Sequence, residues 1–133
     1  MRAKFVYESL NDIFKPKSYE EINKNLSTLS KNERILQLMY NSRDGNLEIV
    51  KTLIENGLDI NSKLYDGNTP LMAACRNIHF DVAEFLLKNG ADVNAKNIYK
   101  YTALEYLLEI MDNESNTNNI FKLINLLKNY GAK

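Results

Sequence analysis

The chain contains 133 residues, enough for one domain with a sizeable core. Its 17 lysines and arginines balance 17 aspartates and glutamates, and this zero net charge excludes the strongly basic surface that binds nucleic-acid phosphates. With a single cysteine, Cys75, no signal-peptide pattern and no apolar run of about 20 residues, we expect a cytoplasmic protein without a membrane partner.

Residues 1–30 contain two short helical patterns. The apolar residues of the first pattern, which fall on one helix face, are Phe5, Val6, Leu10, Ile13 and Phe14. Pro16 ends this pattern, and Ser18 with Glu21 forms a capping-box signature ahead of a second apolar stripe. We interpret residues 1–30 as a helical cap over the edge of the following domain. The alternative is a tether or recognition helix for another protein.

The segment that follows is built on an internal repeat. The pairs of residues that recur 33 positions apart are Gly57 and Gly90, Asp59 and Asp92, Asn61 and Asn94, Thr69 and Thr102, and Leu71 and Leu104. The segment GNLEIVKTLIENG, residues 45–57, likewise aligns with IHFDVAEFLLKNG, residues 78–90. A fixed period with several matches in each unit predicts a stacked repeat protein, because one such unit cannot bury its apolar face alone.

The repeat unit itself predicts a pair of helices. Asp66 and Gly67 favour a turn, Thr69 can cap a helix, and Pro70 suits the first helical position. The following LMAAC is small and apolar, which is typical of a tightly packed inner helix. The segment FDVAEFLLKN has the apolar spacing of an amphipathic outer helix, which Gly90 ends. We expect these helices near residues 70–77 and 80–89.

The stretch from Gly67 to Lys96 resembles the ankyrin repeat, through G-x-TPL-x-AA followed by EFLLKNGADVNAK. The resemblance covers about residues 32–133 and implies an all-α solenoid of stacked helix-turn-helix units. We place the units at residues 31–63, 64–96 and 97–133. Helices are expected near 33–43 and 47–56 in the first unit and near 103–111 and 120–130 in the third. The polar segment at residues 112–119 is expected to be an exposed inserted loop.

Several residues depart from the ankyrin pattern. Ile78 replaces the usual glycine between the two helices, which suggests that this turn bends differently from that of the first unit. The usual histidine after Thr-Pro-Leu is Met72 in the second unit and Glu105 in the third, while Lys100 and Ala103 replace the turn glycine and the proline. Degenerate units are expected at the ends of an array, where one side faces water.

Cys75 and His79 lie four residues apart and are the best candidate pair for nucleophilic chemistry. A cysteine nucleophile needs a base to form its thiolate. Cys75, however, stands where the ankyrin repeat has a buried alanine, and free cysteine is ordinary core material. A metal site needs three or four ligands. We therefore expect no catalytic residue, no metal and no cofactor.

The resemblance also implies where a partner protein would bind. In ankyrin proteins partners dock on the finger tips, the hairpin-like loops between units, and on the exposed face of the inner helices. The fingers here are residues 63–68 and 96–101. The exposed inner-helix positions are Arg43, Asp44, Arg76, Asn77, Glu109 and Ile110.

From these positions we select candidates for partner binding. They are Tyr65, Asp66, Asn68, Arg76, Ile98, Tyr99, Tyr101 and Glu109. Tyrosine and arginine are enriched in interface hot spots, which favours this selection. The alternative is that the tyrosines pack on one another between adjacent fingers.

We therefore expect a monomeric, non-enzymatic module that binds another protein. The alternative is a structural or assembly component that associates through its N-terminal helices. The segment YESLNDIFKPKSYEEI, residues 7–22, also resembles the leader of proteins from large tailed bacteriophages. That resemblance implies a component that acts on host or phage proteins in the cytoplasm of an infected bacterium.

Overall fold

A computed structural model describes residues 18–113, 115 and 117–133 of the chain. These residues form helices joined by turns and loops, and no strand occurs among them. The first helical pattern and most of the segment that resembles phage leaders lie outside the described residues. Within the described part, no helix is both long enough and apolar enough to cross a membrane.

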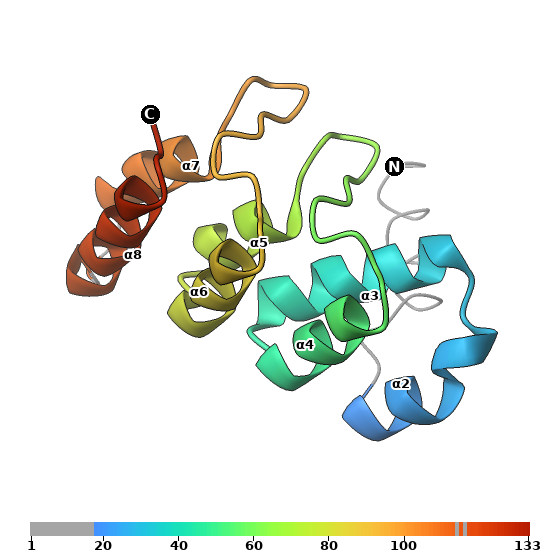
Figure 1. Cartoon of the computed structure of the whole chain (residues 1–133). Helices are drawn as coiled ribbons and strands as arrows, with labels where there is room; N and C mark the ends of the chain where they lie inside the picture. Colours follow the sequence, from blue (N-terminus) through green and yellow to red (C-terminus); the bar gives the residue numbers. More distant parts are fainter. Residues whose placement is uncertain (1–17, 114, 116) are drawn as a thin grey trace, which may run out of the picture.

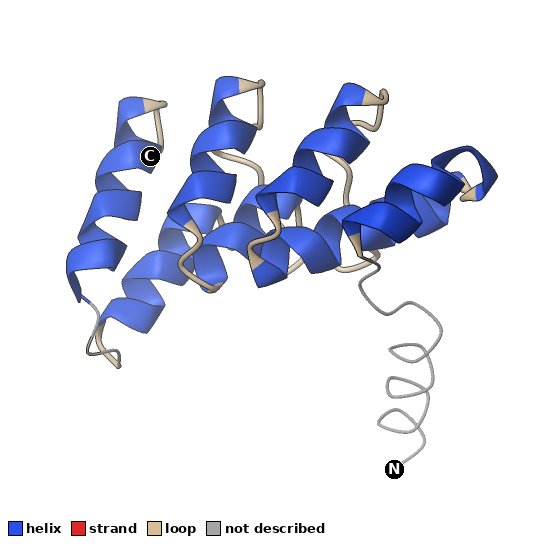
Figure 2. Ribbon diagram, turned by 90° about the horizontal axis from the view of Figure 1, so that it is seen from below, coloured by secondary structure: helices blue, strands red, loops and turns tan. Residues whose placement is uncertain are grey.

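The helices form two rows (Figure 1; Figure 2). The inner row consists of α3 (Lys31–Asp44), α5 (Pro70–Arg76) and α7 (Ala103–Met111), which pack side by side. The outer row consists of α4 (Leu47–Glu55), α6 (Phe80–Lys88) and α8 (Thr117–Asn129). Each outer helix packs against the inner helix that precedes it in the chain. The predicted all-α solenoid of stacked helix pairs is confirmed.

Capping residues set where the inner helices begin. The Ser30 hydroxyl accepts a hydrogen bond from the Glu33 amide at 3.2 Å, and the Glu33 carboxylate accepts one from the Ser30 amide at 2.7 Å. Thr69 caps α5 in the predicted way. Thr102 and Glu105 form a second capping box at the start of α7. The third unit, which lacks the proline, therefore keeps a defined helix start.

The helix α2 (Tyr19–Asn25) and the 3-10 helix η1 (Leu26–Thr28) precede the first inner helix. Ser18 and Glu21 form the predicted capping box of α2. The helix packs against α4 at the end of the outer row, where Ile22 is fully buried (Figure 1). Helix α2 thus covers part of the first outer helix.

The core lies between the two rows and repeats with the sequence. Leu53 and Leu86 occupy matching positions of the outer helices, and Leu71 and Leu104 occupy matching positions of the inner helices. All four side chains are buried. Full burial of such a side chain contributes about 1.5–3 kcal/mol, so each unit adds a similar share to one continuous core.

The turn at Ile78 differs from its expectation. Gly45 has a φ of 79° and Ile78 a φ of 60°, so both residues adopt the left-handed conformation. In both turns the amide of the next residue donates to the carbonyl five positions earlier, at 2.9 Å. The expectation of a different bend was therefore wrong. The Ile78 side chain packs against the core, which offsets a backbone strain of about 1–2 kcal/mol.

The last helix also begins earlier than expected. α8 starts at Thr117 rather than near residue 120, so three residues of the expected polar loop are helical. The apolar stripe begins at Ile120, which is fully buried, and the preceding turn of the helix is exposed. Because an exposed first turn needs no apolar residue, hydrophobic periodicity alone could not locate this start.

Candidate functional site

Two fingers project from the same end of the inner row, at residues 63–68 and 96–101 (Figure 1). A backbone hydrogen bond closes each finger at its base. The Leu64 amide donates to the Asn68 carbonyl at 3.1 Å, and the Asn97 amide donates to the Tyr101 carbonyl at 3.1 Å. The two donors occupy matching positions of successive repeats, as do the two acceptors, so the fingers share one backbone design.

Asn97 joins the two fingers to the inner row. Its side-chain amide donates to Asn68 Oδ1 at 2.9 Å and to the Tyr106 hydroxyl at 2.6 Å. Its carbonyl oxygen Oδ1 accepts from the amides of Tyr99 at 2.9 Å and Tyr101 at 3.0 Å. Asn97 is only 5% exposed, so these bonds form largely away from water. One buried side chain thus fixes the shape of the second finger.

The two fingers also approach each other through their backbones. The Ile98 amide donates to the Asp66 carbonyl at 2.9 Å. Gly67 has a φ of 79°, and a Cβ atom built on it would lie 2.9 Å from Asn97 Cα. A residue with a side chain at position 67 would therefore force the fingers apart.

Three of the candidate residues lie at the finger tips and face solvent. Tyr65 is 84% exposed, Ile98 is 62% exposed and Tyr99 is 68% exposed. Large apolar side chains at this exposure are uncommon on projecting loops, and together they form a tip surface that spans both fingers. We call Tyr65, Ile98 and Tyr99 the tip residues.

Two other candidates, Asp66 and Asn68, hold the first finger together. The Asp66 carboxylate accepts from the Asn68 amide at 3.0 Å and from its side-chain amide at 2.8 Å. Both residues are half-buried. Their polar atoms are thus engaged within the finger pair rather than directed at the tip surface.

The remaining candidates, Arg76, Tyr101 and Glu109, lie with three further residues on the concave surface of the inner row. Arg76 Cζ stands 4.7 Å from the centre of the Tyr106 ring, and the Tyr101 ring lies 5.1 Å from the same ring on a tilt of 37°. The residues that line an open pocket of about 260 Å³ are Arg76, Tyr106, Glu109, Ile110 and Asn113. This concave pocket joins α5 to α7.

Glu109 shapes the electrostatics of this surface. Its negative charge, and then a hydrogen bond between the two side chains, raises the pKa of the Tyr101 phenol. The Tyr101 phenol therefore keeps its proton to a higher pH than an ordinary tyrosine, and the hydrogen bond holds its side chain toward α7. Its ring stacks on Tyr106 rather than on a tyrosine of the other finger.

Cys75 and His79 form no reactive pair. Cys75 is fully buried, and burial raises the pKa of its thiol to about 12. A nucleophilic cysteine needs a lowered pKa, so this environment acts against thiolate formation. The His79 ring lies against the first unit, where a Cβ atom at Gly45 would meet Nδ1 at 2.5 Å. Among the described residues, no group of three histidine, cysteine or carboxylate side chains could hold a metal.

Sequence reasoning missed Asn97 and Tyr106. Tyr106 matches Ala73 of the preceding repeat, at a position of the inner helix that borders the concave surface. A tyrosine in place of a small residue was therefore a usable signal. Asn97 carried no comparable signal, because its role depends on contacts with the neighbouring finger.

Comparison with known proteins gives one family match and two partial relatives. The family described as "Ankyrin repeats (3 copies)" matches residues 18–97. The E3 ubiquitin-protein ligase XBAT33 of Arabidopsis thaliana is 49% identical over 43 residues, which are 32% of this chain and 8% of that protein. The E3 ubiquitin-protein ligase XBAT32 of the same organism is 48% identical over 40 residues, or 30% of this chain and 8% of that protein. The aligned segments therefore cover only a small part of either relative.

Proposed function

This chain belongs to the ankyrin-repeat family, and we propose that it is a non-enzymatic module that binds another protein through its finger tips and concave surface. Ankyrin repeats in general mediate interactions between proteins. The observation that carries the proposal is the exposed tip surface formed by Tyr65, Ile98 and Tyr99. Large side chains of this kind dominate binding energy at protein interfaces.

The hydrogen bonds between the fingers support this role. Asn97 and the backbone bond from Ile98 to Asp66 hold the two fingers in one arrangement. A partner that binds ordered loops avoids much of the entropy loss that ordering them would require. The tip residues are thus presented on a preorganised support.

The two partial relatives are named as ubiquitin ligases, but each match covers 8% of the relative. The shared segment supports a binding role rather than ligase activity. The balanced charge of this chain favours a protein partner over a nucleic acid. Its single cysteine is buried, which is compatible with the reducing cytoplasm where we place it.

Substitution of the tip residues tests the proposal. The wild-type chain would serve as bait in an extract, and each captured protein would be purified and titrated by calorimetry. Tyr65→Ala and Tyr99→Ala should each weaken binding by about 1 kcal/mol or more, which is about fivefold in Kd. Circular dichroism should show an unchanged fold, because both side chains face solvent.

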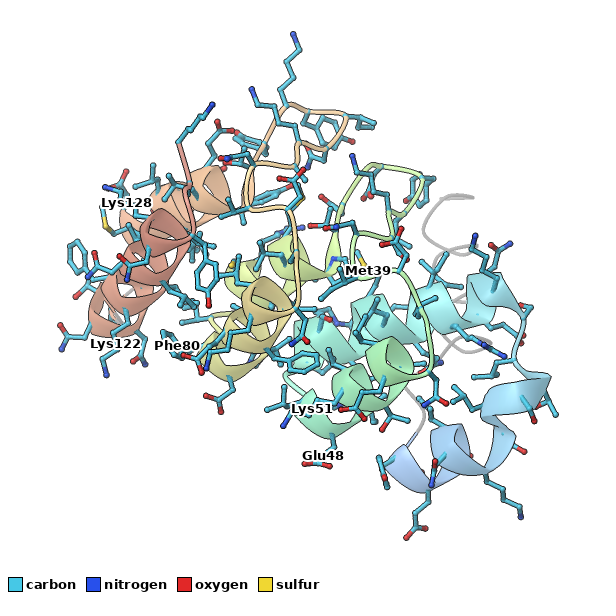
Figure 3. All side chains as sticks on the ribbon, in the orientation of Figure 1. Met39, Glu48, Lys51, Phe80, Lys122 and Lys128 are labelled. Atoms are coloured by element: carbon cyan, nitrogen blue, oxygen red, sulfur yellow. The ribbon has the colours of Figure 1, made fainter. Side chains whose placement is uncertain are left out.

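Glu48→Ala and Lys122→Ala are matched controls. Both residues are exposed and lie on the outer helices α4 and α8, away from the fingers (Figure 3). They should leave the affinity unchanged. If the tyrosine variants also bind with wild-type affinity, the partner binds another surface and the proposal fails.

An assembly role through the N-terminal region makes a different prediction. The packing of α2 on α4, with Ile22 fully buried, supports a covering role for this part of the region. We expect light scattering to give a monomer mass that does not change with concentration. A mass that grows with concentration would favour the assembly role instead.

A further inference from the structure

We propose that Arg76 selects an acidic residue of the partner, an aspartate or glutamate whose carboxylate enters the concave pocket beside Tyr106. This inference rests on the proposed function and adds the chemistry of the residue that the concave surface recognises. It is carried by the position of the guanidinium group and by a comparison of two successive repeats.

The guanidinium group of Arg76 is held in place by stacking. Its Cζ atom lies 4.7 Å from the centre of the Tyr106 ring. The Tyr106 hydroxyl accepts a hydrogen bond from the Asn97 side-chain amide at 2.6 Å, and the Tyr106 ring also contacts the Tyr101 ring. A guanidinium stacked on a fixed aromatic ring keeps its edge donors available to a planar anion such as a carboxylate.

The first repeat shows what binds an arginine at this position. Arg43 is the counterpart of Arg76 in that repeat and is likewise stacked, 5.0 Å from the centre of the Tyr40 ring. Its guanidinium binds the carboxylate of the next residue, Asp44, with Nε at 2.9 Å and a second nitrogen at 3.3 Å. An arginine at this position, there stacked on a tyrosine of its own helix, thus receives a bidentate carboxylate within the chain.

The second repeat lacks this internal acid. Asn77 replaces the aspartate, and its side-chain amide donates to the Ala73 carbonyl at 2.9 Å. Arg76 belongs to neither of the ion pairs among the described residues, which are Arg43–Asp44 and Lys88–Glu84. Arg76 is exposed and borders the concave pocket. A carboxylate from outside the chain would therefore take the place that Asp44 fills in the first repeat.

Glu109 lines the same pocket, but its carboxylate forms no ion pair with Arg76. The two residues hold equivalent positions on neighbouring inner helices, whose axes lie about 8–10 Å apart. The Glu109 carboxylate acts on Tyr101 instead. Salt screens the repulsion between Glu109 and a partner carboxylate at Arg76, because charges in such an exposed pocket are screened over about 8 Å. One partner carboxylate can therefore bind at Arg76, while a second one next to Glu109 is disfavoured.

A peptide selection tests this inference. A displayed library of random peptides would be selected on the immobilised full chain and on its Arg76→Gln variant. Peptides selected on the wild type should share an aspartate or glutamate at one position. For one such peptide, replacement of that acid by its amide should raise the Kd about 10-fold, measured by fluorescence anisotropy.

A double-mutant cycle then tests whether the acidic residue of the peptide interacts with Arg76. Arg76→Gln should raise the Kd of the acidic peptide about 10-fold and should leave the Kd of the amide peptide nearly unchanged. Arg43→Gln is the matched control, because that guanidinium already binds Asp44, and it should change the Kd by less than about twofold. Thermal melts should show that both variants remain folded.

The outcomes separate this inference from the proposed function. Selected peptides without a shared acid, or equal affinity for Arg76→Gln, would overturn the role of Arg76 and leave protein binding in place. A shared lysine or arginine whose effect disappears in Glu109→Gln would show that the pocket takes a base instead. If the wild type enriches no peptide at all while protein capture succeeds, recognition of an acidic segment is overturned. If capture fails as well, the proposed function fails with it.

Discussion

At the scale of single residues, two non-glycine residues of the described part of the chain adopt a backbone conformation that normally favours glycine. Ile78 has a φ of 60° and Lys100 a φ of 67°. A left-handed conformation costs an ordinary residue about 1–2 kcal/mol. Ile78 gains core contacts in return, but Lys100 is exposed at the second finger. Lys100 is therefore the position where the strain has the least compensation.

Lys100→Gly should stabilise the chain. The glycine removes the strain and keeps the amide that donates to the Asn97 carbonyl at 2.9 Å, while its greater freedom in the unfolded state opposes part of the gain. We expect the free energy of unfolding to rise by about 0.5–1 kcal/mol, measured by urea denaturation.

Lys96→Gly is the control for this substitution. Lys96 is also exposed but is not among the residues with a positive φ, so glycine there should lower the free energy of unfolding by about 0.4–1 kcal/mol. Equal effects of the two substitutions would show that backbone strain at position 100 contributes nothing.

At the scale of elements, the fingers depend on one buried amide. Asn97→Ala would remove the acceptor for the Tyr99 and Tyr101 amides and the donor to Asn68 and Tyr106. Buried polar groups left without partners cost about 1–3 kcal/mol, so we expect a loss of about 2–3 kcal/mol in the free energy of unfolding. Chemical denaturation measures this loss.

Asn89→Ala provides the comparison for Asn97. The Asn89 side-chain amide also donates a hydrogen bond, to the Phe85 carbonyl at 2.8 Å, but this bond is exposed. Its loss should change the free energy of unfolding by less than about 0.5 kcal/mol. A similarly small effect of Asn97→Ala would mean that the finger network does not stabilise the fold.

The elements also show what the sequence could predict. Ser30, Thr69 and Thr102 each encode a helix cap through a local pattern, and the structure begins a helix after each one. The first turn of α8, which begins at Thr117, contains no apolar residue, so the sequence pattern placed the start of this helix too late. Local signals thus predict the helices, and the boundary in the exposed polar segment was missed.

The candidate site was less predictable, because it depends on contacts between units. The exposed positions of Tyr65 and Tyr99 follow from their place in projecting loops. By contrast, Asp66 looked available for a partner although its carboxylate binds Asn68. The stacking of Arg76 on Tyr106 joins residues from different inner helices. Such contacts can be identified only once the stacking of the units is known.

At the scale of the whole molecule, one asparagine in each of the first two repeats links its unit to the next. The Asn61 side chain donates to the Gly90 carbonyl at 3.2 Å and accepts from the Asp92 amide at 2.8 Å. Asn94, its counterpart in the next repeat, donates to the Gly131 carbonyl at 3.1 Å and accepts from the Lys133 amide at 3.1 Å. The repeat in sequence is thus also a repeat in the bonds that join neighbouring units.

Loss of each link should act on a different part of the array. Because the stability of a stacked array combines the units with their nearest-neighbour contacts, Asn94→Ala should loosen the terminal pair α7 and α8 most. Asn61→Ala removes a link near the middle of the array and should also lower the protection of α5 and α6 against hydrogen exchange. Each loss of two partly exposed bonds should cost about 1–2 kcal/mol.

Native-state hydrogen exchange can resolve these two effects helix by helix. Asn56→Ala serves as a control, because the Asn56 side-chain amide donates within its own helical segment, to the Thr52 carbonyl at 2.7 Å. It should alter exchange around the end of α4 alone. If Asn94→Ala instead lowers protection equally in α3 and α8, the described part of the chain unfolds as one cooperative unit. The asparagine links would then stabilise the whole array rather than one interface each.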